Sequence, residues 1–206
     1  AAHVGDTIRS LRRHQPELLV EALVGDFGGR TRDIDVVLAA TPDVFAHNIE
    51  VVRRLTPSIR DQRCDYDRSL EVLRHAKERA PERFVKSSVM VGIGEGDDEV
   101  ERTLTDLRAV GVDVVTLGQY LRPSSKHAPV HRYVEPRRFE AWAELGRELG
   151  FAHVASGPLV RSSYHAAEAF ISALVRPSAP APQASSGAAP AGFVPAGRLR
   201  RRTADG

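Results

Sequence analysis

The sequence contains very little cysteine: Cys64 is the single one among 206 residues. One cysteine excludes a disulfide framework and any metal or iron–sulfur site built from several thiolates of this chain. It is compatible with a reducing compartment. Long apolar runs are also missing, since none approaches the roughly 20 residues that a membrane-spanning helix needs. We therefore expect no membrane partner.

Most of the chain also lacks an excess of either charge. Five of the 29 Lys and Arg lie from Arg176 onward, together with one of the 27 Asp and Glu. Residues 1–175 thus carry 24 basic and 26 acidic side chains. Nucleic-acid binding needs a basic face on the fold itself, so we expect no nucleic-acid partner. We interpret Arg198 to Arg202 as a solvated charge run, not a binding patch.

The composition changes near Arg176. Before it, the chain is long and apolar enough for one domain with a core. After it, Ala, Pro, Ser and Gly dominate, and the few apolar side chains do not offset the entropy of ordering. We predict a domain over 1–175 and a disordered tail over 176–206. The start of the chain, Ala1–Thr7, has neither Met nor a basic and apolar leader, so we expect it to begin inside a longer fold.

Apolar runs alternate with helical patterns along the domain. The predicted strands cover 18–24, 43–47, 84–91, 112–117 and 153–156, and the predicted helices cover 31–40, 66–80, 97–109, 136–149 and 164–175. This alternation is typical of α/β proteins with parallel βα units. Five strands do not close an eight-stranded barrel. We therefore predict a partial, TIM-like βα barrel.

Polar, glycine-rich or proline-containing segments follow all five predicted strands. They are Gly25 to Arg30, His47 to Glu50, Met90 to Glu95, Gly118 to Ser124 and Ser156 to Tyr164. In parallel βα folds the ligand binds where the carboxyl ends of the strands converge. The loops at the opposite ends, such as Arg79 to Arg83, are merely charged. One rim of the sheet is therefore predicted to hold a site.

Each of these groups also has a purely structural interpretation. The glycine pattern over 92–95 is typical of a tight strand-to-helix turn. His47 and Asn48 fit a hydrogen-bonded core pair, and Gln119 fits polar packing. The segment Arg161 to Ser163 fits a helix cap. For each group alone the structural explanation is the better one, and their joint occurrence at one rim favours a site.

Five longer motifs carry a resemblance to a known family. Residues 42–50 read PDVFAHNIE, 86–95 KSSVMVGIGE, 117–123 LGQYLRP, 132–136 RYVEP and 155–164 ASGPLVRSSY. In order and spacing, from about Ala2 to Ala173, these motifs are similar to segments of the lipoyl synthases. The resemblance implies a radical S-adenosylmethionine barrel whose cofactors are S-adenosylmethionine and two 4Fe-4S clusters.

The resemblance also assigns roles to matching residues. Those expected around S-adenosylmethionine are His47, Asn48, Lys86, Met90, Gly92, Gly94, Glu95, Gln119 and Leu121. In the family a serine of the RSSY motif ligates iron of the auxiliary cluster, and here we favour Ser163 over Ser162, supported by Arg161. Oxygen is an unusual ligand for iron that thiolates normally hold. A weak ligand suits a cluster that must give up its sulfur.

The cysteine ligands of both clusters are absent from the sequence. The family places two cysteine triplets ahead of the region that matches Ala1. We therefore expect this chain to be the C-terminal part of a lipoyl synthase and to be inactive alone. We interpret Cys64 as structural or incidental.

The complete enzyme is expected to insert two sulfur atoms into an octanoyl chain on a carrier lysine. Side-chain acid–base chemistry does not break an unactivated C–H bond, so a cofactor must supply the radical. The implied partners are octanoylated lipoyl carrier domains or the glycine cleavage H protein, and ferredoxin or flavodoxin as electron donor. The implied compartment is the cytoplasm in a bacterium, and the mitochondrion or plastid in a eukaryote.

Two other functions compete with this one. Another βα-barrel enzyme that binds phosphate would need a glycine-rich anion loop at a helix N-terminus, and Glu95 places a carboxylate there. A non-catalytic barrel fragment agrees with the missing cluster cysteines.

Overall fold

The computed structural model of the protein describes residues 1–162. Its helices are α1 (Ala2–His14), α2 (Thr31–Leu38), α3 (Thr56–Ile59), α4 (Tyr66–Arg79), α5 (Asp97–Ala109) and α6 (Pro136–Glu148), with short 3-10 turns η1 (Phe27–Gly29) and η2 (Arg53–Leu55). Its strands are β1 (Glu21–Leu23), β2 (Val44–Ala46), β3 (Phe84–Val91), β4 (Val114–Gln119) and β5 (His153–Gly157). No helix within residues 1–162 is both long and apolar enough to cross a bilayer. The predicted helix over 164–175, the tail over 176–206 and Ser163 lie outside the described residues.

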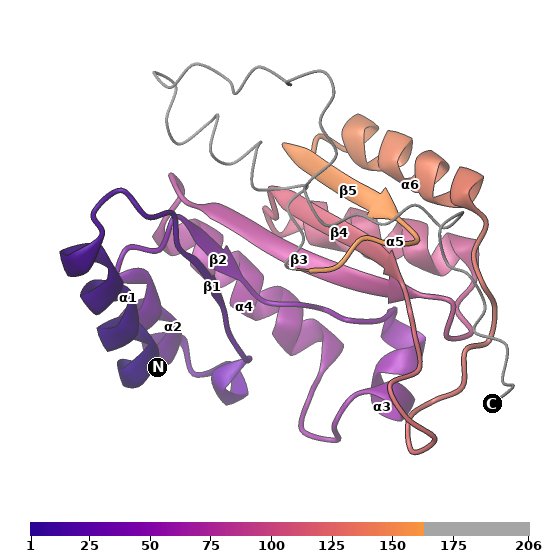
Figure 1. The fold of residues 1–206 in the computed structure, drawn as a ribbon, viewed down its shortest axis with the longest axis horizontal. Helices are drawn as coiled ribbons and strands as arrows, with labels where there is room; N and C mark the ends of the chain where they lie inside the picture. The colour runs from indigo at the N-terminus through magenta and orange to yellow at the C-terminus, as the bar shows by residue number, and fades with distance from the viewer. Residues whose placement is uncertain (163–206) are drawn as a thin grey trace, which may run out of the picture.

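The five strands form one parallel sheet in the order β1-β2-β3-β4-β5. Each crossover between parallel neighbours is right-handed as a rule, so a sheet that always advances in one direction carries its helices on one face. Figure 1 shows α4 and α5 behind the strands, and α6 packs against β5. This arrangement confirms the predicted α/β fold and is that of part of a βα barrel.

The core lies between the sheet and the helix layer. Alternate residues of β3 (Val85, Val89 and Val91) are fully buried on that side. They belong to the same apolar cluster as Leu73 of α4 and Leu107 of α5. Since side chains alternate across a strand, Lys86, Ser88 and Met90 lie on the opposite face. The concave face of the partial barrel is therefore the polar one.

Helix α1 was not predicted from the sequence. Its thirteen residues bury only Gly5 and Ile8, so the apolar stripe that would reveal a helix is too narrow. Contacts with α2 hold it in place instead. The missed turns η1 and η2 and the four-residue α3 are too short to show a period.

The first strand is shorter than the predicted 18–24. The guanidinium of Arg12, in α1, donates to the carbonyl of Leu18 at 2.7 Å and binds the Asp43 carboxylate at 2.5 Å. That carboxylate also accepts from the backbone N–H of Val20 at 2.7 Å. Side-chain hydrogen bonds thus replace strand pairing at Leu18 and at the Val20 N–H, while the Val20 carbonyl still accepts from Val44 N of β2 at 3.2 Å.

Strand β1 is an edge of the described sheet and exposes Leu23, whose accessible fraction is 50%. Unpaired edges with apolar side chains promote association between molecules. We expect Leu23→Lys to reduce the self-association of this chain, measured by light scattering against concentration. Leu159→Lys, at a more exposed leucine outside any strand, is the control. An equal reduction by both variants would mean that general hydrophobicity, and not the edge, drives association.

Candidate functional site

The carboxyl ends of the five parallel strands meet at one edge of the sheet, as predicted. His47 and Asn48 directly follow β2, Gly92 follows β3, and Gln119 ends β4. Two backbone hydrogen bonds continue the pairing beyond β2, from His47 N to the Lys86 carbonyl and from Glu50 N to the Ser88 carbonyl. The structure thus brings the segment after β2 alongside the second half of β3.

Lys86 lies inside the concave face and not at its rim. Its side chain is 3% exposed, and its ammonium contacts the Glu21 carboxylate of β1 at 2.7 Å. Beside it, the Thr116 hydroxyl donates to the Ser88 hydroxyl at 2.8 Å. The Glu21 side chain is 30% exposed, so water reaches one partner of this ion pair. The polar side chains on the floor of the concave face are therefore paired with one another.

His47 carries an unpartnered buried atom. The residue is 3% exposed, and its Nδ1 lies 2.9 Å from the carbonyl oxygen of Val24. A carbonyl only accepts, so Nδ1 carries the proton and Nε2 of the neutral ring is an acceptor. None of the described residues hydrogen-bonds to Nε2. An unsatisfied buried polar atom is uncommon in proteins, and here it can accept from an amino or hydroxyl group of a ligand.

The Glu95 carboxylate holds its own loop together. One oxygen accepts from Gly92 N at 2.7 Å, and the other accepts from Ile93 N at 2.9 Å and Gly94 N at 3.2 Å. The side chain is 1% exposed. Three converging N–H groups are a favourable site for a carboxylate. In this structure the role of Glu95 is to shape the β3–α5 loop.

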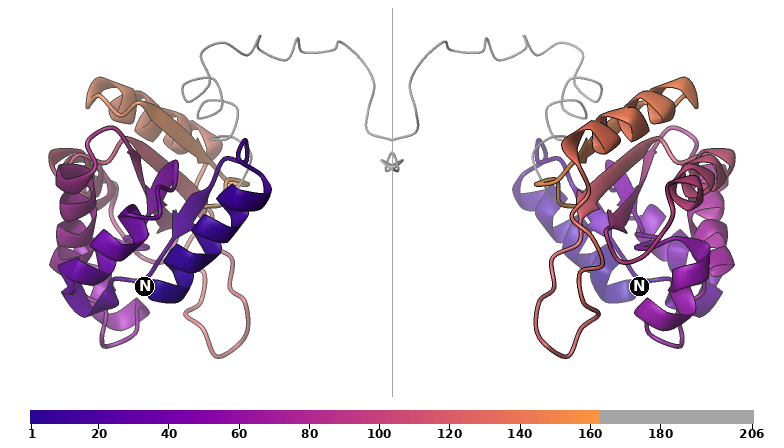
Figure 2. Two further views of the ribbon diagram at one scale, coloured as in Figure 1. Left: turned by 90° about the vertical axis from the view of Figure 1, so that its left-hand side faces the viewer. Right: turned by 90° about the vertical axis from the view of Figure 1, so that its right-hand side faces the viewer.

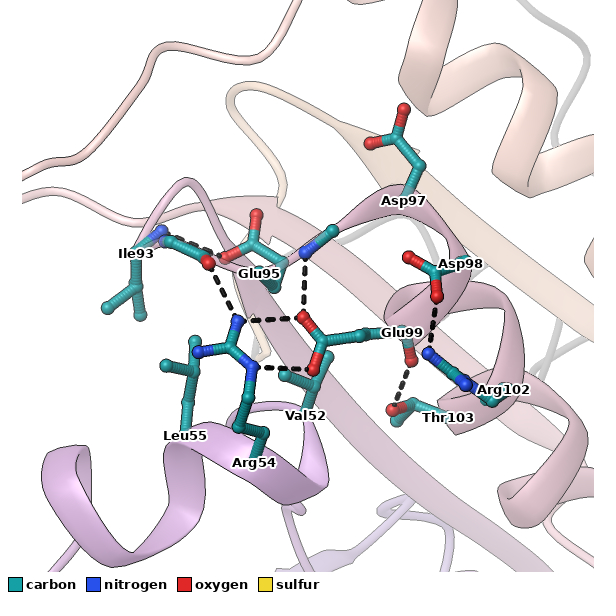
Figure 3. A network of polar contacts seen from close by, with 12 residues as sticks. Val52, Arg54, Leu55, Ile93, Glu95, Asp97, Asp98, Glu99, Arg102 and Thr103 are labelled. Atoms are coloured by element: carbon teal, nitrogen blue, oxygen red, sulfur yellow. Dashed lines mark hydrogen bonds and ion pairs between the residues drawn. The ribbon is translucent and has the colours of Figure 1, made fainter.

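Side chains outside the β3–α5 loop also hold it in place (Figure 3). Arg54 of η2 donates to the Gly94 carbonyl at 2.9 Å and pairs with Glu99 of α5. Glu99 in turn accepts from Gly96 N at 2.8 Å, which satisfies a free N–H at the start of α5. The loop between β3 and α5 is therefore held by side chains of η2 and α5 in addition to its own Glu95.

Gln119 joins this loop to the next one. Its Nε2 donates to the carbonyls of Tyr120 and Arg132, and its Oε1 accepts from Val134 N at 2.9 Å. It lies on the helix side of β4, opposite to Gly118. A side chain on Gly92 would collide with the Gln119 amide and the Arg132 carbonyl, and its φ of +97° also requires glycine. Gln119 is thus a clamp between the two loops and does not share a face with Lys86.

The other predicted contacts are spread around the rim. Met90 is half-buried on the concave side, and Asn48 donates to the Glu50 carboxylate at 3.2 Å. Gly94, with a φ of +123°, has open space around its Cα, since its nearest neighbour is the His131 ring. Leu121 is 53% exposed on the surface. The set is not one enclosed pocket in the described structure.

The segment after β5 crosses the end of β4. A side chain at position 118 would collide with the Val160 carbonyl, so this close approach requires Gly118. Arg161 donates to this carbonyl at 2.7 Å and is exposed, and Ser162 is half-buried. Ser163 lies outside the described residues, so its predicted iron ligation stays a prediction.

The described residues fit the two implied cofactors differently. Unpartnered His47 Nε2 and the open backbone at Gly94 suit a nucleoside and amino-acid ligand such as S-adenosylmethionine. No group of three or more His, Cys, Asp or Glu within residues 1–162 is placed to hold a metal. A 4Fe-4S cluster needs about three or four thiolates, and the sequence has Cys64 alone. This donor set does not fit a cluster.

Several residues that shape the rim were missed by sequence reasoning. Arg54, Arg132 and Glu21 act through partners 45, 35 and 65 positions away in the chain. Nothing in their local pattern indicates such partners. Arg132 lies within the RYVEP motif, and this was the one available signal.

The role of Glu95 can be tested by Glu95→Gln. The amide places N–H donors against backbone N–H donors and removes the charge, so buried groups lose their acceptor. We expect the free energy of unfolding to fall by about 2 kcal/mol, measured by urea denaturation. Glu101→Gln, an exposed carboxylate on α5, should change it by less than about 0.5 kcal/mol. Equal effects of the two variants would contradict the bracing role.

Burial lowers the pKa of His47 below its ordinary value, and the hydrogen bond to Val24 opposes this only in part. The unfolded chain therefore takes up a proton near pH 6.5 that the folded chain does not. The stability contribution is present above pH 6.5 and is lost as the pH falls toward the lowered pKa. Between pH 7 and 5.5, wild type should therefore lose more stability than His47→Gln. Equal losses of stability in wild type and His47→Gln, measured by chemical denaturation, would contradict the lowered pKa of His47.

Comparison with known proteins identifies relatives over most of the chain. No family model matches the sequence. The lipoyl synthase of Sorangium cellulosum is 56% identical over 203 residues, which are 92% of this chain and 55% of that protein. The lipoyl synthase of Myxococcus xanthus is 53% identical over 175 residues, 85% of this chain and 59% of that protein. Lipoyl synthase 1, chloroplastic, of Oryza sativa subsp. indica is 49% identical over 186 residues, 90% of this chain and 50% of that protein.

Similarity to solved structures is weaker. A radical S-adenosylmethionine methyltransferase from Kitasatospora setae has a TM-score of 0.45 and 16% identity, over 59% of this chain and 25% of that chain. So distant a likeness does not indicate function. The chain spans about half the length of the curated relatives it matches. With about half of its residues identical to those relatives over most of its length, the chain belongs to the lipoyl synthase family.

Proposed function

We propose that this chain forms the cofactor- and acyl-binding rim of a lipoyl synthase. The complete protein would insert two sulfur atoms into an octanoyl chain that a carrier protein bears on a lysine. The observation that carries the proposal is the 56% identity to a named lipoyl synthase over 203 residues. The rim supports it, because the matching motifs lie at the carboxyl ends of parallel strands, where βα folds bind ligands.

In such an enzyme S-adenosylmethionine and 4Fe-4S clusters supply the radical chemistry that breaks unactivated C–H bonds. The contribution of this chain is to bind and orient. His47 Nε2 would accept a hydrogen bond from an amino or hydroxyl group of S-adenosylmethionine. The braced loop from Gly92 to Gly96 would present its backbone to the ligand without moving. Ordering these groups before binding avoids an entropic cost at the time of binding.

The activity is proposed for the complete protein and not for these 206 residues. The clusters need cysteine ligands that the sequence does not contain, so no step through a cluster follows from these residues. Ser163, supported by Arg161 two positions earlier, remains the proposed oxygen ligand of the auxiliary cluster. The carrier domain or H protein and a ferredoxin or flavodoxin donor are likewise proposed partners. Chloroplastic and mitochondrial relatives support a plastid or mitochondrial compartment if the source is a eukaryote, and the cytoplasm is proposed for a bacterium.

The test uses the complete protein with its clusters. We expect it to form 5′-deoxyadenosine and lipoyl product from an octanoylated carrier. His47→Ala should weaken S-adenosylmethionine binding about 10-fold, which corresponds to roughly 1.4 kcal/mol, measured by equilibrium dialysis. His75→Ala, at a histidine that pairs with Asp35 on the helix layer, should leave binding unchanged. Wild-type protein that forms neither product would refute the proposal.

A further inference from the structure

The long connection between β4 and α6 differs in charge from the rest of the molecule. Residues 120–138, here called the basic segment, contain five Lys and Arg and one acidic residue, Glu135. The remaining described residues contain 19 basic and 24 acidic side chains. The basic segment thus carries a net positive charge, and the other described residues together carry a net negative charge. This contrast is invisible in the near-neutral total.

The basic segment begins at the ligand-binding edge. It leaves the carboxyl end of β4 after Gln119 and ends in the first turn of α6, which begins at Pro136. Figure 2 shows this connection protruding beyond the rest of the fold in both views. Residues 121–127 are all exposed. A large partner can therefore contact the segment while one of its side chains reaches the rim.

The protruding part is preformed. The Tyr120 hydroxyl donates to the Ala128 carbonyl at 2.9 Å, and Arg122 donates to the carbonyls of Ser125 and His127. The Ser124 hydroxyl and the His127 ring are hydrogen-bonded at 2.9 Å. At its base, His131 N and Arg132 N both donate to the Gly92 carbonyl. Little ordering entropy is left to lose when a partner binds.

Its charges are incompletely compensated. Within residues 1–162, Arg122 and Lys126 have no carboxylate partner. Arg132 and Arg138 share the Asp97 carboxylate at 2.7 Å each, and Arg132 also lies 3.8 Å from Glu95. Arg137 pairs with Glu135 at 2.5 Å. Arg122 donates to neutral carbonyls, which leave its positive charge in place. Exposed uncompensated charges of one sign attract a partner of the opposite sign.

We propose that the basic segment is a docking surface for an acidic protein domain that presents an acylated lysine to the rim. This inference rests on the proposed function and deepens it by naming where the acyl carrier binds. The surface is convex, so it suits a second folded domain better than a small anion. A long nucleic acid would have to run over the negative body, whereas a compact domain contacts the segment alone.

The test compares two substrates with the complete, cluster-loaded protein. One is an octanoylated carrier domain of net negative charge, and the other is a short uncharged peptide with the same octanoyl-lysine. We expect Lys126→Glu to lower kcat/KM for the domain about 10-fold at low salt and to leave the peptide within about twofold. The effect on the domain should shrink as salt is raised, because exposed charges are screened. Arg137→Glu should act in the same direction.

Arg13→Glu is the matched control, since Arg13 is an exposed cation on α1, far from β4 in sequence. It makes the same charge change and should affect neither substrate. Equal effects of Lys126→Glu on domain and peptide, or of Arg13→Glu and Lys126→Glu on the domain, would overturn the docking site alone. So would competition by duplex DNA at physiological salt. Absence of product from both substrates with wild-type protein would overturn the proposed function and the docking site with it.

Discussion

The Glu95 carboxylate is the contact on which the rest of the rim depends. By gathering the N–H groups of Gly92 to Gly94, it turns the chain sharply after β3 and leaves the Gly92 carbonyl facing outward. That carbonyl accepts from the backbone of His131 and Arg132, which places the base of the basic segment. A local turn after one strand thereby sets the position of a loop that follows the next.

The motifs shared with lipoyl synthases are, in this structure, largely architectural. Gln119 bridges two loops, Gly118 admits the Val160 carbonyl, and Glu95 closes a turn. His47 differs from these three, because its Nε2 has no partner within the described residues. A binding site of this kind consists of a few free groups and a larger number of residues that hold them still. Motif matching alone assigns both kinds the same role.

Sequence patterns predicted the sheet well because its signals are local. The bounds of β3 and α5 were correct to the residue, since an apolar run and an acidic first turn mark them. Helix α1 was missed because its buried stripe is only two residues wide. The rim was predicted as a location, from the loops after each strand. The side-chain contacts of the rim were not predicted. Partners such as Lys86 and Glu21 lie on strands that β2 separates, and no local sequence period indicates such a pair.

The strand order of the sheet also bears on how the chain folds. Each strand pairs with the one before it in the sequence, so no strand must wait for a distant partner. Loop-closure entropy grows with the length of chain enclosed, and pairing each strand with the previous one encloses less chain than a pairing that skips strands. Because the order follows chain direction, the sheet can grow strand by strand during synthesis, each addition covering the edge that the previous one exposed.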